Sequence, residues 1–212
     1  SLACISGFQL HFSSENIYTA GDMCDVLVAM NPAALSVNVE NLKANGILIV
    51  NSNNFAARNL KLAGYDTNPL EDGSLVPYQV FAVELTRLTR EALKVTSLSQ
   101  REIDRCKNFF AVGMVCWLYN RPMDYTLKFI ADKYSAKPQY VEANTLALKA
   151  GNVYCEATEQ FATSYEVQPA KFPPGTYRNI EGNMGTALGL IAASKKSGLQ
   201  LVYGSYPITP AS

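Results

Sequence analysis

The chain has 212 residues, and its 18 Lys and Arg are balanced by 18 Asp and Glu, so the formal net charge is zero. This balance provides neither the basic excess typical of nucleic-acid-binding proteins nor an acidic solvating tail, and we expect no nucleic acid partner. The longest apolar run, 108–120, is too short to cross a bilayer and therefore indicates a buried helix and no membrane partner.

The cysteines and the single histidine do not form a pattern typical of a metal or redox centre. Five cysteines are widely spaced and never form a CxxC pair: Cys4, Cys24, Cys106, Cys116 and Cys155. This spacing opposes a disulfide framework, a zinc site or an iron–sulfur cluster held by this chain, and reduced thiols in the cytoplasm are the simple account. His11 lies on the polar side of an alternating segment, where a solvated face is favoured over a catalytic role.

The first predicted elements are a hairpin, a strand and a helix. Residues 8–19 alternate apolar and polar side chains around a polar turn, which predicts a hairpin. The continuous apolar run 25–31 predicts a strand covered on both faces. Asn31 and Pro32 are a typical helix start, and the helix is expected to extend over 32–44.

The next elements predict a parallel sheet. The helix is expected to stop at 45–46, and the run 47–51 predicts a second buried strand, which completes a strand–helix–strand unit. A helix is expected over 54–64, followed by a third strand over 78–84. These elements indicate an α/β fold with a largely parallel or mixed sheet covered by helices.

The following region is expected to be helical. Ser99 and Glu102 form a capping box, which predicts a helix that runs on through the apolar segment 109–119, whose aromatic side chains we expect in the core. Apolar residues at helical spacing predict another helix from Pro122. A further helix is expected to follow Pro138.

The composition changes in the last third of the chain and predicts three parts. We expect an α/β domain over 1–162, an extended linker over 163–181 that contains three prolines, and the beginning of a second α/β domain over 182–212. In this last part a helix is expected to end at Gly198, and 199–203 is expected to form a strand. The small residues of the helix form a smooth face where another backbone could approach: Gly185, Gly189 and Ala193.

The most specific motif is the closing loop, 206–210, which consists of Tyr206, Pro207, Ile208, Thr209 and Pro210. Two prolines restrict the backbone around Thr209, so its hydroxyl is presented in one direction at the end of a predicted strand. Open α/β sheets bind ligands at such strand ends, which makes Thr209 a candidate for a hydrogen bond to a substrate. The alternative is that the prolines only terminate a strand.

Two further segments could either bind a ligand or have only a structural role. The helix start at 182–185 could bind an anion, but it lacks the spacing of a dinucleotide fingerprint, and a packing helix is favoured. Asp66, Glu71 and Asp72 could hold a cation, but a solvated loop is favoured.

The segments "DVLVAMNPAAL" and "NGILIVN" resemble the gamma domain of 2-oxoacid:ferredoxin oxidoreductases, and "EGNMGTALGLIAASKKSGLQLVYGSYPITPAS" resembles the start of their thiamine-pyrimidine domain. The order of these segments is similar to that of the alpha subunit of the 2-oxoglutarate type. Family members commonly have Gly-Asn-Glu at the helix start, whereas Met184 follows Asn183 here, so position 184 receives no role. The family's first strand and glycine-rich turn do not precede Ser1, and we expect the native polypeptide to extend past both ends of this sequence.

The resemblance implies an enzyme that oxidatively decarboxylates a 2-oxoacid on thiamine diphosphate, passes electrons to ferredoxin and transfers the acyl group to coenzyme A. It places the diphosphate, its Mg²⁺ and an iron–sulfur cluster in a partner beta subunit, so this piece alone is expected to bind no cofactor and to be inactive. It places Tyr206, Pro207, Ile208, Thr209 and Pro210 beside the thiamine, where Thr209 would donate a hydrogen bond to the substrate carboxylate or developing oxyanion.

Two alternatives remain beside this enzyme hypothesis. One is a non-catalytic α/β binding or subunit-assembly module, and the other is a nucleotide-binding domain of another family, for which no phosphate loop is found. The residues also leave the 2-oxoacid open among 2-oxoglutarate, pyruvate and branched compounds.

Overall fold

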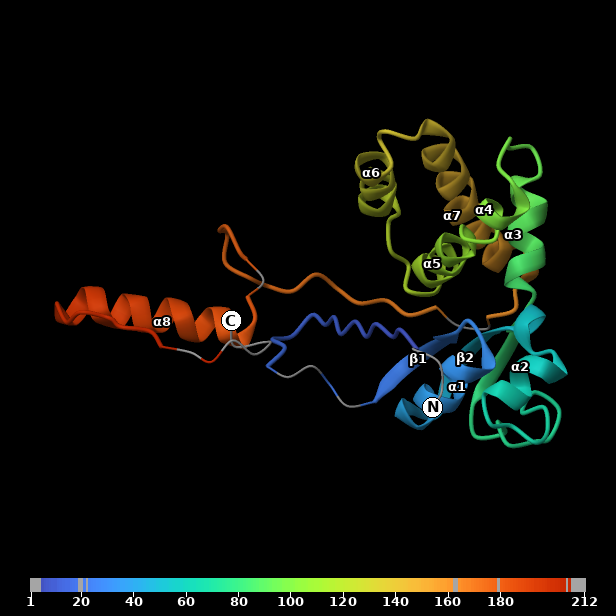
Figure 1. The fold of residues 1–212 in the computed structure, drawn as a ribbon, viewed down its shortest axis with the longest axis horizontal. Helices are drawn as coiled ribbons and strands as arrows, with labels where there is room; N and C mark the ends of the chain where they lie inside the picture. Colours follow the sequence, from blue (N-terminus) through green and yellow to red (C-terminus); the bar gives the residue numbers. More distant parts are fainter. Residues whose placement is uncertain are drawn as a thin grey trace. The chain divides into compact units, whose positions relative to one another are not determined.

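The structure is a computed structural model that describes residues 5–18, 21, 23–161, 164–178, 180–204 and 206. It divides into two compact units, Ser1–Ala170 and Lys171–Ser212, which we call unit 1 and unit 2. Figure 1 shows the helices and strands of both units. Among the described residues, no helix has both the length and the apolarity needed to cross a membrane.

Unit 1 is built on a three-stranded sheet of β1 (Cys24–Ala29), β2 (Leu42–Asn51) and β3 (Gln79–Val83). The strand order is β1-β2-β3 and both pairs are parallel, which confirms the predicted α/β fold. The central strand is buried over 47–51, because helices cover both faces of a parallel sheet.

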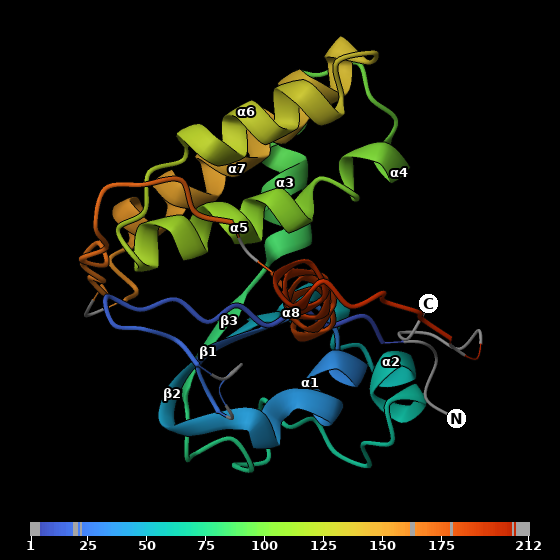
Figure 2. The same ribbon diagram turned by 90° about the vertical axis from the view of Figure 1, so that its left-hand side faces the viewer.

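One face of the sheet is covered by α1 (Pro32–Asn38) and α2 (Ala57–Leu62), with short 3₁₀ turns η1 (Val39–Asn41) and η2 (Ser52–Asn54) beside them. Leu48 and Val50 of β2 pack here against Leu35 of α1 and Leu60 of α2. The two helices connect β1 to β2 and β2 to β3, and Figure 2 shows both on this side of the sheet.

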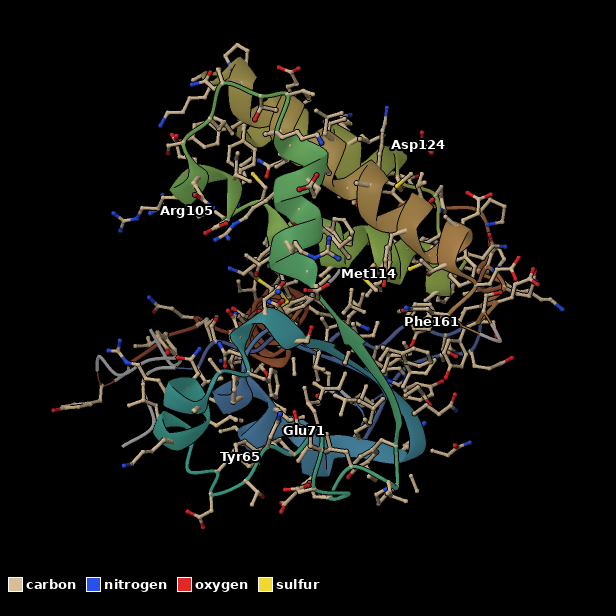
Figure 3. All side chains as sticks on the ribbon, turned by 90° about the vertical axis from the view of Figure 1, so that its right-hand side faces the viewer. Tyr65, Glu71, Arg105, Met114, Asp124 and Phe161 are labelled. Atoms are coloured by element: carbon tan, nitrogen blue, oxygen red, sulfur yellow. The ribbon has the colours of Figure 1, made fainter. Side chains whose placement is uncertain are left out.

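The other face is covered by a helical layer of α3 (Leu85–Leu93), α4 (Gln100–Ile103), α5 (Lys107–Leu118), α6 (Asp124–Lys133) and α7 (Pro138–Thr158). Ile47 and Ile49 of β2 pack against Phe110 and Met114 of α5 and Cys155 of α7. Figure 3 shows Met114 and Phe161 between this layer and the sheet, whereas Tyr65 and Glu71 lie beyond the opposite face.

The capping box is confirmed, but the helix that it opens is shorter than predicted. Ser99 and Glu102 form both reciprocal bonds, yet α4 ends at Ile103 and α5 begins separately at Lys107. The N–H of Cys106 donates to the carbonyl of Ile103 at 2.9 Å, a tight turn that separates the two helices. The predicted helices after Pro122 and Pro138 are confirmed, the first beginning at Asp124.

The prediction of a helix over 32–44 is wrong in its second half. The helix ends at Asn38, and Leu42 already belongs to β2, where it is buried and pairs with Cys24. Asn45 is not a helix stop: it has φ 60 and lies in an irregularity of β2, where its N–H donates to the carbonyl of Pro77 at 2.7 Å. Leu35 of α1 and Leu42 of β2 belong to one core cluster, and Val39 of the intervening turn packs against it.

The predicted hairpin at 8–19 is wrong for the residues described, because 5–18 contain no strand. Phe8 and Leu10 are 90% and 67% exposed, so the alternating pattern has no sheet face on which to bury its apolar side. A two-stranded hairpin without such a face is marginal in water.

Unit 2 contains α8 (Gly182–Ser197), which ends as predicted at Gly198 in the left-handed conformation. The predicted strand at 199–203 is wrong in this structure: these residues contain no strand, and Leu199 and Val202 are exposed. The described part of unit 2 supplies no second strand for it to pair with. On the small-residue face of α8, a Cβ at Gly189 would meet no atom within 4 Å outside the helix's own backbone, and a Cβ at Gly185 would lie 3.8 Å from the side chain of Ile180.

Candidate functional site

The closing loop lies almost wholly outside the described residues. Pro207, Ile208, Thr209 and Pro210 are not described, and Tyr206 is 79% exposed. The role of Thr209 and its neighbours therefore stays a prediction.

A second candidate for a ligand site lies among the described residues, at the carboxyl edge of the sheet, where open α/β sheets bind ligands. The strand ends are level, because Ala29 pairs with Val50 and Asn51 pairs with Val83. Polar side chains follow all three strands, and we call them the carboxyl-edge cluster: Asn31, Asn51, Asn53, Asn54, Glu84, Thr86 and Arg87.

Asn51 is the buried centre of the cluster, with none of its surface exposed. Its amide Nδ2 donates to Oγ1 of Thr86 at 3.0 Å, and the backbone N–H of Thr86 donates to its Oδ1 at 3.4 Å. Because a buried amide without partners is costly, this pair fixes the end of β2 against the first turn of α3.

An ion pair lies on the exposed side of the cluster. Glu84 accepts from Nε of Arg87 at 2.8 Å, and the backbone N–H of Arg87 donates to Oδ1 of Asn53 at 3.0 Å. The hydrogen bond from Arg87 lowers the pKa of Glu84 from its usual value, so this carboxylate is ionised at neutral pH. Glu84 is thus held as an acceptor and is unsuited to donate a proton.

Of two further asparagines, Asn54 joins the ends of β2 and β1, and Asn31 caps α1. Nδ2 of Asn54 donates to the carbonyl of Met30 at 2.8 Å, and Oδ1 of Asn31 accepts from the N–H of Ala34 at 2.8 Å, which caps α1. Within the cluster these polar groups bond one another and the backbone, so they hold the ends of the strands together. The cluster is not arranged for acid–base chemistry, because its carboxylate is paired and ionised.

Sequence reasoning passed over this cluster, although a signal was present. The run "NSNN" at 51–54 directly follows the buried strand, and polar residues in that position mark the ligand edge of a parallel sheet.

The acidic loop is solvated, as favoured from the sequence. Asp72 accepts from the N–H of Ser74 at 2.9 Å and from Oγ1 of Thr67 at 2.5 Å. Hydrogen bonds from the side chain of Ser74, the side chain of Thr67 and the backbone of Ser74, in that order, lower the pKa of Asp72. Asn68 donates to Glu71 at 2.8 Å. The carboxylates therefore stabilise the turn, and in the described part of the chain no group of three His, Cys, Asp or Glu side chains could hold a metal ion.

The described cysteines are free thiols in separate surroundings. Cys106 belongs to a cluster between α3, α4 and α7, and Cys155 to the core beneath the sheet. Burial raises the pKa of Cys106 to about 11 and that of Cys155 to about 12, so both stay protonated at neutral pH and act as packing residues.

The three-stranded parallel sheet between two helical layers defines an α/β fold. Residues 5–154 match the family model described as pyruvate ferredoxin/flavodoxin oxidoreductase. That range is most of the chain, and the chain belongs to this family.

Two individual proteins are similar to it. The 2-oxoglutarate oxidoreductase subunit KorA of Mycobacterium tuberculosis (strain ATCC 25618 / H37Rv) is 49% identical over 212 residues, which are 100% of this chain and 32% of the relative. This chain thus spans about a third of the length of that protein. The structure of a 2-oxoglutarate:ferredoxin oxidoreductase from Magnetococcus marinus, with 2-oxoglutarate, coenzyme A and succinyl-CoA bound, matches with a TM-score of 0.60 at 23% identity, over 93% of this chain and 30% of that chain. This second likeness shows the fold, and the family resemblance found in the sequence is confirmed.

Proposed function

We propose that this chain is part of the alpha subunit of a thiamine diphosphate-dependent 2-oxoacid:ferredoxin oxidoreductase that converts 2-oxoglutarate, coenzyme A and oxidised ferredoxin to an acyl-CoA, CO₂ and reduced ferredoxin. The observation that carries the proposal is the 49% identity with a 2-oxoglutarate oxidoreductase subunit across the whole length of this chain. A sequence identity of 49% along the whole chain favours an enzyme for 2-oxoglutarate over an enzyme for pyruvate or a branched 2-oxoacid.

The proposed cofactor is thiamine diphosphate with Mg²⁺, which supplies carbanion stabilisation when bound. We propose that the diphosphate, its Mg²⁺ and the iron–sulfur cluster belong to a beta subunit. What supports this division is the chemistry of the described cysteines and carboxylates, which are packed in cores or engaged in turns and ion pairs. The described residues do not supply a donor set for these groups.

Within this chain, the proposed contact with the thiamine is the loop 206–210, in which Thr209 donates a hydrogen bond to the substrate carboxylate or the developing oxyanion. The proposed layout is a gamma-type domain over 1–162, a linker over 163–181 and the beginning of the pyrimidine domain over 182–212. The proposed ligand surface of the gamma-type domain is the carboxyl edge of its sheet, because open α/β sheets bind ligands at that edge. The proposed location is the cytoplasm, where ferredoxin and coenzyme A are available.

The experiment is a substrate comparison with the full-length polypeptide and its partner subunit. Reduction of ferredoxin should require coenzyme A, and kcat/KM should be highest for 2-oxoglutarate among 2-oxoglutarate, pyruvate and 2-oxoisovalerate. A complex that assembles but reduces ferredoxin with none of the three would instead support the non-catalytic assembly module.

A further inference from the structure

Three aromatic side chains from distant parts of unit 1 meet just beyond the C-terminal end of α5. The ring of Tyr119 stacks on Tyr165, with centroids 4.9 Å apart and planes 23° apart. The same ring meets Phe12 edge-on at 5.1 Å and 67°. Both are arrangements in which aromatic rings attract beyond the area that they bury.

Two further contacts join this aromatic group to the backbone and to a cation. The N–H of Tyr165 donates to the carbonyl of Leu118 at 2.6 Å, and so satisfies one of the carbonyls that the last turn of α5 leaves without a helical partner. The guanidinium of Arg121 lies over the ring of Phe12 at 5.7 Å. Burial raises the pKa of Tyr119 to about 12, so its hydroxyl stays neutral at physiological pH.

A deeper anchor lies four residues before Tyr165 in the sequence. Phe161 is only 5% exposed and packs against Phe81 of β3, with centroids 4.4 Å apart, and against Trp117 at 6.0 Å. It belongs to the main core, whereas Tyr165 lies at the edge of that core. The described residues after Tyr165, up to 178, contain no helix or strand.

We infer that Phe12, Tyr119 and Tyr165 form a latch that sets the point at which the chain leaves unit 1. When the latch is closed, the chain is held as far as Tyr165. When it opens, the last firm anchor is Phe161, and the tether toward unit 2 gains four residues, or about 13 Å of reach at about 3.3 Å per extended residue.

The shared ring of Tyr119 makes the latch cooperative. Phe12 belongs to the segment 5–18, which contains no helix or strand and whose side chains at Phe8 and Leu10 are exposed. Because Phe12 and Tyr165 pack on the same ring, loss of either contact loosens the other. The latch therefore couples the order of the segment 5–18 to the length of the free tether, and this inference does not depend on the proposed reaction.

Hydrogen–deuterium exchange and limited proteolysis of the full-length protein test the latch. Tyr165→Ala should raise the exchange rate of the residue-165 amide, which donates to the carbonyl of Leu118, at least tenfold, and should speed limited proteolysis within 5–18. Phe12→Ala should raise exchange at the residue-165 amide in the same way. Tyr165→Phe keeps the stacked ring and should keep protection near the wild-type level. Peptides of α7 should be unchanged in all three variants.

Tyr177→Ala is the matched control, since Tyr177 packs on Phe172 in unit 2 at 5.1 Å and has no part in the latch. It should leave exchange at the residue-165 amide and proteolysis within 5–18 unchanged. Unaltered exchange at the residue-165 amide in Tyr165→Ala would overturn the latch. So would a loss of protection that is equal in α5 and α7, because that pattern reports general unfolding of unit 1. Faster exchange at the residue-165 amide in Tyr165→Ala, with proteolysis within 5–18 unaffected, would overturn the coupling through Tyr119.

Discussion

Gly113 of α5 and Gly151 of α7 lie where the two helices cross, and each stands where a side chain would strike the backbone of the other helix. A Cβ at Gly113 would overlap the carbonyl oxygen of Leu148, and a Cβ at Gly151 would overlap that of Phe110. The two glycines thus permit the close approach of the helices that cover the sheet. Nδ2 of Asn152 adds a hydrogen bond to the carbonyl of Gly113 at 3.4 Å across the crossing.

We predict that Gly113→Ala and Gly151→Ala each destabilise unit 1 by about 3 kcal/mol, the upper end of the cost of overpacking. Alanine is the better helix former by about 1 kcal/mol, but the atoms in its way are backbone and cannot rotate aside. Urea unfolding monitored by circular dichroism measures the change. Val153→Ala is the control, because this side chain on the same helix is 55% exposed and should change stability by less than about 0.5 kcal/mol. Equal stability of the glycine variants and the wild type would contradict the close crossing.

The capping box predicts a specific dependence of stability on pH. Glu102 accepts from the N–H and hydroxyl of Ser99 and from the hydroxyl of Tyr140, and these hydrogen bonds lower its pKa from 4.5 to about 2. Because the folded pKa lies below the unfolded value, the carboxylate stabilises the fold fully above pH 4.5, and this contribution is lost as the pH falls from about 4.5 to about 2.

The urea midpoint, measured from pH 2 to pH 6, should therefore fall less steeply at low pH in Glu102→Gln than in the wild type. Tyr140→Phe removes one of the donors and should give an intermediate slope. Parallel curves for wild type and Glu102→Gln would show that the network does not shift the titration of this carboxylate.

The buried pair at the carboxyl edge should behave as a unit. Thr86→Val removes the hydroxyl that accepts from Asn51 and leaves the buried Nδ2 of Asn51 without its acceptor, which should cost about 1–3 kcal/mol. Asn51→Leu should also destabilise the protein. The double variant should lose less stability than the sum of the two single losses, because replacing both partners removes the unpaired group. Strict additivity in the unfolding free energies would argue against the pairing.

The parallel sheet could be predicted from the sequence because its central strand is a continuous apolar run. A parallel strand that is buried on both faces requires this pattern. Sequence patterns failed where two structures share one pattern. Leu35, Val39 and Leu42 have helical spacing, yet Leu42 lies in β2, and the spacing alone does not distinguish a strand entered through a turn. The strand at 199–203 failed for a different reason: pairing depends on a neighbour and is not a property of the segment.

Helix α3 was not predicted because threonines occupy part of its buried face. Thr86 and Thr89 are buried there beside Leu85 and Leu93. The segment therefore has few apolar residues at helical spacing to indicate a buried face. The hydroxyl of Thr89 donates to the carbonyl of Leu85 at 2.7 Å, which makes its burial possible. The same difficulty hid the carboxyl-edge cluster, whose asparagines look like loop residues until the strand ends are brought together.

The role proposed for Thr209 is tested by Thr209→Val in the complete enzyme. Valine keeps the β-branched shape between Pro207 and Pro210 and removes only the hydroxyl. A hydrogen bond to a charged group contributes about 1.5–3 kcal/mol, and each 1.36 kcal/mol is about tenfold in rate, so kcat/KM for 2-oxoglutarate should fall by roughly ten- to a hundredfold. Cofactor content and the unfolding midpoint should be unchanged. Less than a twofold effect would support the alternative that the loop only terminates a strand.

The most direct test of the central claim is the electron and carbon balance of the reaction. The full-length polypeptide with its partner subunit should convert 1-¹³C-2-oxoglutarate to ¹³CO₂ and succinyl-CoA, with two one-electron ferredoxins reduced for each CO₂, as measured by mass spectrometry and absorbance in the same reaction. Release of ¹³CO₂ without coenzyme A consumption and without reduced ferredoxin would show a simple decarboxylase and would contradict the proposed oxidoreductase.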